Sequence, residues 1–255
     1  MVLSAKIILI VIAGCFLAAF MDSMAGGGGI ISIPAYLLAG LPVHLALGTN
    51  KLSAGTGSLF CSFIYAKKGF ADLKLAVPGM ACAMCGAVIG TYLQLLVAEK
   101  YLEYMLLAAL PIVAVVVLRK KTLPEVTEPM QTGKRLAVIC IASFVIGIYN
   151  GFYGMGTGTF LLLIFCSLAK MDVRRANGNV KLINLTADFS SMLTALISGK
   201  VWVTLGLIAA VASIGGNLFG AKLAIKNGSK IVRPTVVVVL VLLAVKILWD
   251  FLSAA

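Results

Sequence analysis

The sequence has 255 residues, of which 61% are hydrophobic and only 12% carry a charged side chain. Soluble globular proteins carry about 25% charged residues, so these charges are too few to cover a surface that faces water. A soluble globular fold is therefore excluded. The length allows about eight to ten membrane crossings of roughly 20 residues each and leaves no room for a separate soluble domain. We expect an all-α polytopic membrane protein in contact with the lipid bilayer.

The net charge of +12 does not indicate a nucleic-acid partner. Lys and Arg are concentrated in short loops between apolar segments, where they set the orientation of a chain in the membrane, and they form no basic patch with interleaved aromatic residues. The six cysteines lie inside apolar segments, and His44 is the only histidine. We therefore expect no metal site and no cofactor.

Five apolar segments follow one another in each half of the chain. They are 5–25, 29–41, 44–66, 73–97 and 100–118 in the first half, and 135–153, 157–169, 176–198, 201–225 and 231–252 in the second. The second segment of each half, about 13 residues long, is shorter than the roughly 17–25 residues that a crossing needs. Each half thus predicts about four transmembrane helices plus one short broken or re-entrant helix after a glycine-rich loop.

The two halves form an internal repeat. A shift of 130 residues places Lys51 on Lys181 without a gap. The same shift matches Gly26 with Gly156, Gly28 with Gly158, Gly48 with Gly178, Gly86 with Gly216 and Gly90 with Gly220. Chance matches in an apolar chain would be leucines rather than glycines and lysines. We expect a first transmembrane repeat, 1–118, a cytoplasmic basic linker, 119–134, and a second transmembrane repeat, 135–255, within one integral membrane domain.

Loop charges predict that the two repeats are inverted. The cation-rich connections are 67–74, the central linker, 170–175 and 226–233, and all of them should be cytoplasmic. Each half then makes an odd number of net crossings, so the second half sits upside down relative to the first. Inverted repeats are typical of secondary transporters.

The stretch "MAGGGGIISIP", which begins at Met24, indicates a helix broken inside the membrane. Each glycine weakens a helix by roughly 1 kcal/mol against alanine, and the free N–H groups at the start of the following helix bind anions. The predicted anion-binding backbone comprises Gly26, Gly27, Gly28 and Gly29, with Gly156, Thr157 and Gly158 in the second half. The alternative is that these glycines only allow close helix packing, which is how we interpret the Gly-x-x-x-Gly pairs at Gly86 and Gly216.

Lys51 and Lys181 are the second candidate for holding an anion. A lysine near the middle of a span costs on the order of 3 kcal/mol, which favours a functional role, although snorkelling to an interface is the alternative. The candidate amide donors around them are Asn50, Asn150 and Asn179. Asp22 and Asp188 are the carboxyl groups best placed for proton coupling, but Asp188 could instead pair with Lys181, seven residues earlier on its helix.

Residues 26–54, "GGGGIISIPAYLLAGLPVHLALGTNKLSA", resemble the signature region of the TauE/SafE sulfite exporter family, with "GTNK" at 48–51 as the most specific part. The resemblance implies a multi-pass carrier, usually in a prokaryotic inner membrane, for a sulfur-containing anion such as sulfite or an organosulfonate. It also implies secondary active export, with coupling to protons as an open alternative. The second half departs from the pattern, with "GNVKLIN" in place of "GTNK".

Two other function classes compete with a carrier. A passive anion channel would give fast, unsaturated flux. An intramembrane enzyme needs a serine beside a base. Ser23 with His44 is the candidate pair, but the sequence has no nucleophile motif. We therefore expect no catalytic residues. The oligomeric state is left open, with a homodimer as one alternative.

Overall fold

The computed structural model describes residues 5–102, 130–227 and 230–231, and the description below is confined to them. These residues form helices without strands. The first half contains α1 (Ala5–Ala25), α2 (Gly29–Leu38), α3 (Val43–Lys67) and α4 (Leu73–Leu96), and the second contains α6 (Thr132–Phe152), α7 (Thr157–Ser167), α8 (Val173–Ile197) and α9 (Val203–Asn227). The predicted all-α fold is confirmed. The predicted segments 100–118 and 231–252 and the linker 119–134 lie largely outside the described residues.

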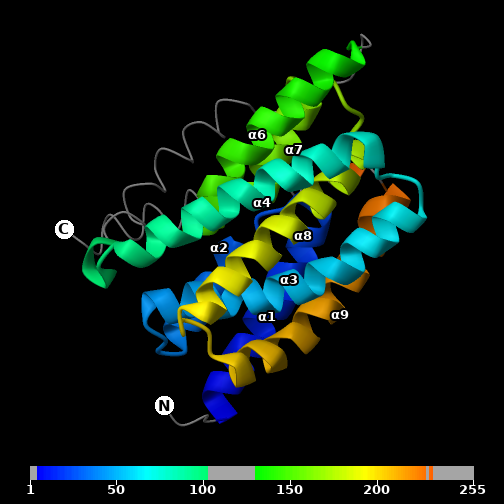
Figure 1. Ribbon diagram of the computed structural model, residues 1–255. Coiled ribbons are helices and arrows are strands. Elements are labelled where there is room, and N and C mark those ends of the chain that lie inside the picture. Colours follow the sequence, from blue (N-terminus) through cyan, green and yellow to red (C-terminus); the bar gives the residue numbers. More distant parts are fainter. Residues whose placement is uncertain (1–4, 103–129, 228–229, 232–255) are drawn as a thin grey trace, which may run out of the picture.

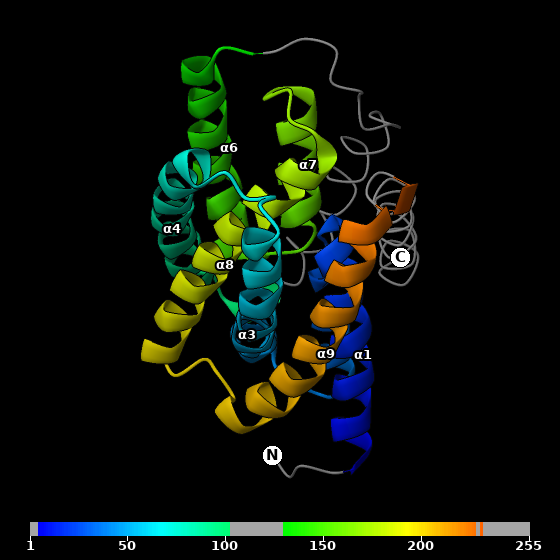
Figure 2. The same ribbon diagram turned by 90° about the vertical axis from the view of Figure 1, so that its right-hand side faces the viewer.

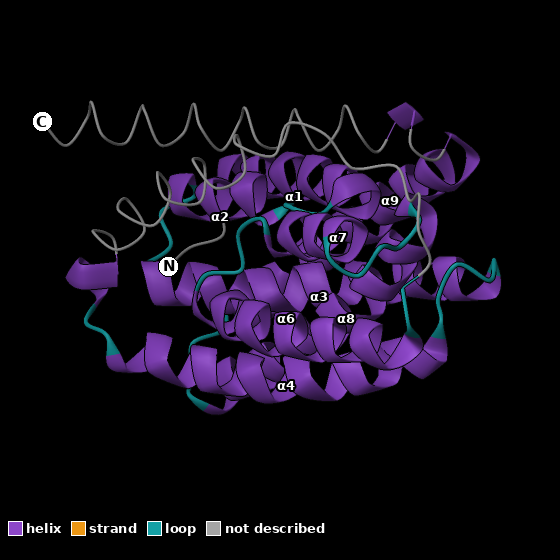
Figure 3. Ribbon diagram, turned by 90° about the horizontal axis from the view of Figure 1, so that it is seen from above, coloured by secondary structure: helices purple, strands orange, loops and turns teal. Residues whose placement is uncertain are grey.

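The helices form a layered bundle with α3 and α8 at its centre (Figures 1 and 3). On one side of this pair, α9 packs against α3 and α1 packs against α9; on the other, α4 packs against α8 and α6 against α4. Exchange of the two halves leaves this pattern unchanged, because α1, α3 and α4 correspond to α6, α8 and α9 at the 130-residue shift. Figure 2 shows the α3–α4 and α8–α9 connections at opposite ends of the bundle.

Two hydrogen bonds are equivalent under the same shift. The Trp202 main-chain N–H donates to Thr49 Oγ1 (2.9 Å), and the Asp72 main-chain N–H donates to Asn179 Oδ1 (3.1 Å). Each bond ties the start of one central helix to the connection that follows the other, so α3 and α8 run antiparallel. How each half is oriented in the membrane stays a prediction.

The surface of the bundle is apolar, as a lipid-facing surface must be. Ile141 on α6, Val211 on α9 and Phe219 on α9 each expose 65–72% of their surface. Five of the described helices, α1, α4, α6, α8 and α9, have the length and hydropathy of membrane crossings. Helix α3 has the length, at 25 residues, but polar residues on its buried side lower its hydropathy, so its predicted crossing rests on its place in the bundle.

The two Gly-x-x-x-Gly pairs are packing positions, as predicted. A Cβ atom on Gly86 would meet the main chain of α6 at Phe144, and one on Gly216 would meet the main chain of α1 at Phe16 and Phe20. Helices α4 and α6, and likewise α1 and α9, can approach this closely because these positions lack side chains.

Neighbouring glycines on α9 provide a test of this packing. Alanine improves helix propensity by roughly 1 kcal/mol at either position, but a Cβ on Gly216 would lie 2.9 Å from the Phe20 main-chain nitrogen, whereas one on Gly215 would make ordinary contact at 3.5 Å with the Phe16 ring. We expect Gly216→Ala to lower the free energy of unfolding by about 1–3 kcal/mol, and Gly215→Ala to leave it unchanged or raise it. Thermal unfolding in mild detergent measures both, and equal effects would contradict the close contact.

Candidate functional site

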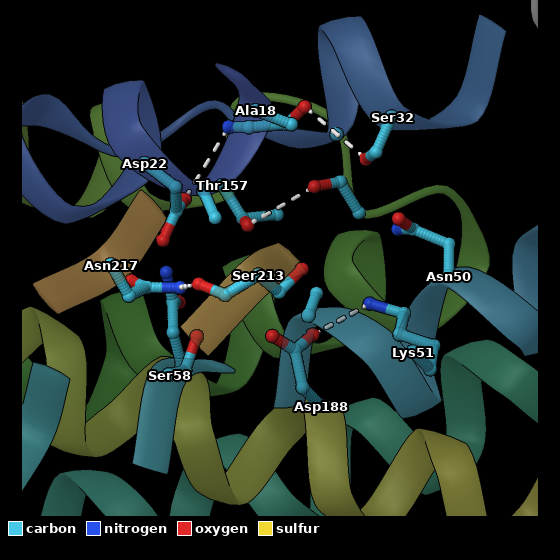
Figure 4. A pocket seen from close by; sticks show the side chains of 16 residues that line it. Ala18, Asp22, Ser32, Asn50, Lys51, Ser58, Thr157, Asp188, Ser213 and Asn217 are labelled. Atoms are coloured by element: carbon cyan, nitrogen blue, oxygen red, sulfur yellow. Dashed lines mark hydrogen bonds and ion pairs between the residues drawn. The ribbon is translucent and has the colours of Figure 1, made fainter. Parts of the chain in front are cut away.

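A polar cavity lies where the two halves meet. It contains about 490 Å³ of empty space, its open mouth included, and is lined from α1, α2, α3, α8 and α9 and from the start of α7. Figure 4 shows polar side chains from several helices directed into one space. The polar lining residues are Asp22, Ser32, Asn50, Lys51, Ser58, Thr157, Asn184, Asp188, Ser213 and Asn217.

The two glycine-rich loops touch each other beside this cavity. A Cβ atom on Gly158 would lie 2.8 Å from the Cα atom of Gly26, so neither position tolerates a side chain. Thr159 Oγ1 donates a hydrogen bond to the Ala25 carbonyl oxygen (3.0 Å) across the same contact. Gly26 and Gly156 adopt left-handed backbone conformations, with φ of +77° and +76°, which glycine reaches without strain. The contact brings two helix starts to one place.

Both helix starts line the cavity, and neither is capped by the side chain of its own N-cap residue, because that residue is a glycine. Gly28 and Gly29 lie at the start of α2, and Thr157 is the first residue of α7. At α2, the Gly28 N–H donates to Asp22 Oδ1 at 3.3 Å. The first N–H groups of a helix have no acceptor within it and carry a partial positive charge. Two such ends at a single cavity favour an anionic ligand.

Among the residues that the structure describes, Lys51 contributes the one ammonium group that lines the cavity. Its Nζ donates to Asn150 Oδ1 (2.6 Å) and to Asp188 Oδ1 (2.9 Å), and its side chain is only 7% exposed. Snorkelling does not describe this side chain, because its ammonium group is held by partners inside the bundle. Asn150 lies behind the ion pair and also donates through Nδ2 to Asp188 Oδ1 (3.0 Å).

Lys181 forms a separate ion pair and does not line the cavity. Its Nζ donates to Asp22 Oδ2 (2.8 Å) and to the main-chain oxygen of Asp22, and its side chain is fully buried. The alternative pairing of Lys181 with Asp188 is therefore wrong. Seven residues along a helix separate two positions by about 10 Å, and each group has a closer partner on another helix.

The predicted site residues divide into three groups. Those that line the cavity are Asp22, Gly28, Gly29, Asn50, Lys51, Thr157 and Asp188. Those that lie beside or behind the lining are Gly26, Gly27, Asn150, Gly156, Gly158 and Lys181. Asn179 is apart from both groups, since it bonds to Asp72 near the start of α4 and to the Arg175 carbonyl oxygen. For all of these residues, a role in binding stays a prediction.

Five polar lining residues were absent from the predicted site residues: Ser32, Ser58, Asn184, Ser213 and Asn217. Two of them carried a usable signal, because Ser213 and Asn217 are four residues apart and so share one face of an otherwise apolar helix. The amide oxygens of Asn50 and Asn217 are buried and have no hydrogen-bond partner among the described residues. Buried polar atoms are normally satisfied, and an amide oxygen is an acceptor, so these oxygens indicate a place for water or for a ligand group that donates a hydrogen bond.

Comparison with known proteins agrees with this geometry. The sequence profile described as "Sulfite exporter TauE/SafE" matches residues 11–247. The chain belongs to the TauE/SafE family. Similar relatives include "Probable membrane transporter protein ORF9" of Sinorhizobium sp., which is 34% identical over 92% of this chain and 90% of the relative. No solved structure matches the chain.

Two further relatives support the same class. "Probable membrane transporter protein YfcA" of Escherichia coli strain K12 is 32% identical over 92% of this chain and 87% of the relative. A "Probable membrane transporter protein" of Haemophilus influenzae is 30% identical over 92% of each chain. Membership of the TauE/SafE family, with the five apolar helices, makes the protein a multi-pass membrane transporter.

The enzyme alternative has no support from the proposed Ser23–His44 pair in this TauE/SafE protein. Ser23 Oγ donates to the Phe20 carbonyl oxygen (2.9 Å), whereas the His44 ring bonds to the Val97 carbonyl oxygen (3.1 Å) and to Gln94 (2.6 Å). The serine thus has no histidine base beside it.

The Lys181–Asp22 pair predicts a stability effect that a double mutant can isolate. Lys181→Gln leaves the Asp22 carboxylate without its cation, and loss of one member of a buried pair costs about 3–5 kcal/mol. The same change at the exposed Lys222 should cost less than about 0.5 kcal/mol. Adding Asp22→Asn to Lys181→Gln should recover part of the loss, measured as the free energy of unfolding in detergent. Additive losses in the double mutant would contradict a direct interaction.

Proposed function

We propose that this protein is a secondary active transporter that exports a small sulfur-containing anion, such as sulfite or an organosulfonate, by alternating access. The observation that carries the proposal is the convergence of two helix starts with glycine N-caps and the Lys51 ammonium group on one polar cavity. The family description names sulfite, and this is the reason for proposing a sulfur-containing substrate. The predicted location is a prokaryotic inner membrane.

The cavity matches the chemistry of a compact oxyanion. Sulfite and sulfonate groups present several oxygen atoms in a small volume, and each accepts hydrogen bonds. The cavity offers N–H groups from two directions and one ammonium group, together with hydroxyl groups from Ser32, Ser58 and Ser213. Hydrogen bonds to a charged group each contribute about 1.5–3 kcal/mol, so a few of them suffice for selective binding.

The position of the cavity favours a carrier over a channel. It lies between halves of matching architecture, where alternating-access transporters place their substrate. In such a cycle the α1–α9 pair and the α4–α6 pair would move relative to the central α3 and α8. Saturable flux would separate this cycle from a passive anion channel. A homodimer stays one alternative for the oligomeric state.

Proton coupling is part of the proposal, and Asp22 and Asp188 are its candidates because both carboxyl groups line the cavity. A carboxyl group can carry a proton across with the anion and release it on the other side. The predicted ligands Gly26 and Gly158 act through the loop contact rather than through their own cavity surface. Gly27 and Gly156 contribute the left-handed backbone conformations that precede the two helix starts.

The test of the proposed site is a binding isotherm for Lys51 variants in detergent. We expect the unmodified protein to bind one or more of sulfite, thiosulfate and sulfoacetate more tightly than chloride. Lys51→Gln should weaken that binding by about tenfold to a hundredfold, because a charge-assisted hydrogen bond contributes roughly 1.5–3 kcal/mol. Lys51→Arg should recover only part of the loss, since a planar guanidinium replaces a compact ammonium group.

Lys181→Gln is the control for this experiment, because Lys181 is the repeat equivalent of Lys51 but does not line the cavity. Its effect on affinity should be smaller. All variants should elute as single monodisperse species in gel filtration. A change of about twofold or less for Lys51→Gln, which is under 0.5 kcal/mol, would remove Lys51 from the site.

A further inference from the structure

The two carboxyl groups of the cavity use their oxygen atoms differently. At Asp188, Oδ1 accepts both hydrogen bonds, from Lys51 Nζ (2.9 Å) and from Asn150 Nδ2 (3.0 Å). The other oxygen, Oδ2, has no hydrogen-bond partner among the described residues. Figure 4 shows the Asp188 side chain reaching into the cavity with one oxygen toward Lys51. A proton can therefore be added at Oδ2 without breaking either existing bond.

Asp22 has no such free oxygen. Its Oδ1 accepts from the Gly28 N–H at the start of α2 (3.3 Å), and its Oδ2 accepts from Lys181 Nζ (2.8 Å). Protonation would remove the negative charge that attracts the helix start and the buried lysine. Asp22 is therefore a positioning residue, which holds the start of α2 and the buried Lys181.

The charged groups around the cavity already balance one another, so an anion that binds there needs a compensating positive charge. Asp188 faces Lys51 on α3 and Asp22 on α1, and Lys181 lies on its own helix beyond Asp22. The residues that α2, α7 and α9 bring to the lining are neutral, and α4 and α6 bring none. With two carboxylates and two ammonium groups the formal charge is zero, so a bound monoanion would be an unpaired buried charge, which is costly.

We propose that Asp188 is the proton-coupling residue and that one proton binds at its Oδ2 for each monoanion that binds beside Lys51. This assignment rests on the proposed function of the cavity as an anion site. An O–H bond forms at Oδ2 with a proton from the solution at the cavity mouth, and the carboxyl group loses its charge. The anion then becomes the negatively charged partner of the Lys51 ammonium group, which keeps its hydrogen bond to Oδ1 of the neutral carboxyl group. One monoanion and one proton together move no net charge.

The experiment measures sulfite affinity against pH for the unmodified protein, Asp188→Asn and Asp22→Asn. The protonation of sulfite itself affects all three equally and cancels in ratios. Because binding takes up a proton at Asp188, the affinity of the unmodified protein relative to Asp188→Asn should fall as the pH rises, by up to about tenfold per pH unit. Asp188→Asn imitates the protonated carboxyl group, so its binding should be tight and lack this pH dependence.

The matched variant Asp22→Asn should keep the pH dependence of the unmodified protein, even if its overall affinity or stability falls. Equal pH dependence in the unmodified protein and Asp188→Asn would overturn the proposal. Loss of the dependence in Asp22→Asn alone would assign the coupling to the other carboxyl group and would also overturn it. Failure of the unmodified protein to bind sulfite at any of these pH values contradicts the proposed function, and this assignment falls with it.

Discussion

The contact between the two glycine-rich loops is the constraint on which the candidate site depends. Gly26 and Gly158 approach so closely that neither can carry a side chain. Backbone that leaves the helical pattern inside a membrane must be covered by protein or water. Here each loop covers the other, and the short helices α2 and α7 begin on either side of the contact. Two helix starts from opposite halves of the chain thereby border one cavity.

The ion pairs give this arrangement its asymmetry. Lys51 and Lys181 are equivalent in the repeat, yet only Lys51 lines the cavity, where its partner Asp188 keeps one oxygen free. Lys181 is enclosed and binds Asp22 through both the carboxylate and the main chain. The same cation therefore occupies both positions that match at the 130-residue shift, but its surroundings differ. The repeat equivalent of Asp188 is Ser58, so a carboxylate is present in only one of the two equivalent positions.

Local sequence patterns predicted the helices well because helix length, glycine position and apolar runs are local properties. The predicted segment 5–25 coincides with α1, and the 130-residue shift maps the bounds of α3 onto those of α8. The ion-pair partners could not be predicted in this way, since Lys51 and Asp188 are 137 residues apart and meet only after α3 and α8 pack. The same reason explains why Lys181 was matched with a neighbour on its own helix instead of with Asp22 on α1.

The central claim is that an oxyanion binds between the starts of α2 and α7 beside Lys51. Selenite has the charge and pyramidal shape of sulfite and scatters X-rays anomalously, so its position in a crystal of the full-length protein can be located directly. The account predicts an anomalous peak within hydrogen-bond distance, roughly 3 Å, of Lys51 Nζ and in contact with the two helix starts. A selenite peak elsewhere in the protein, with this cavity empty, would contradict it.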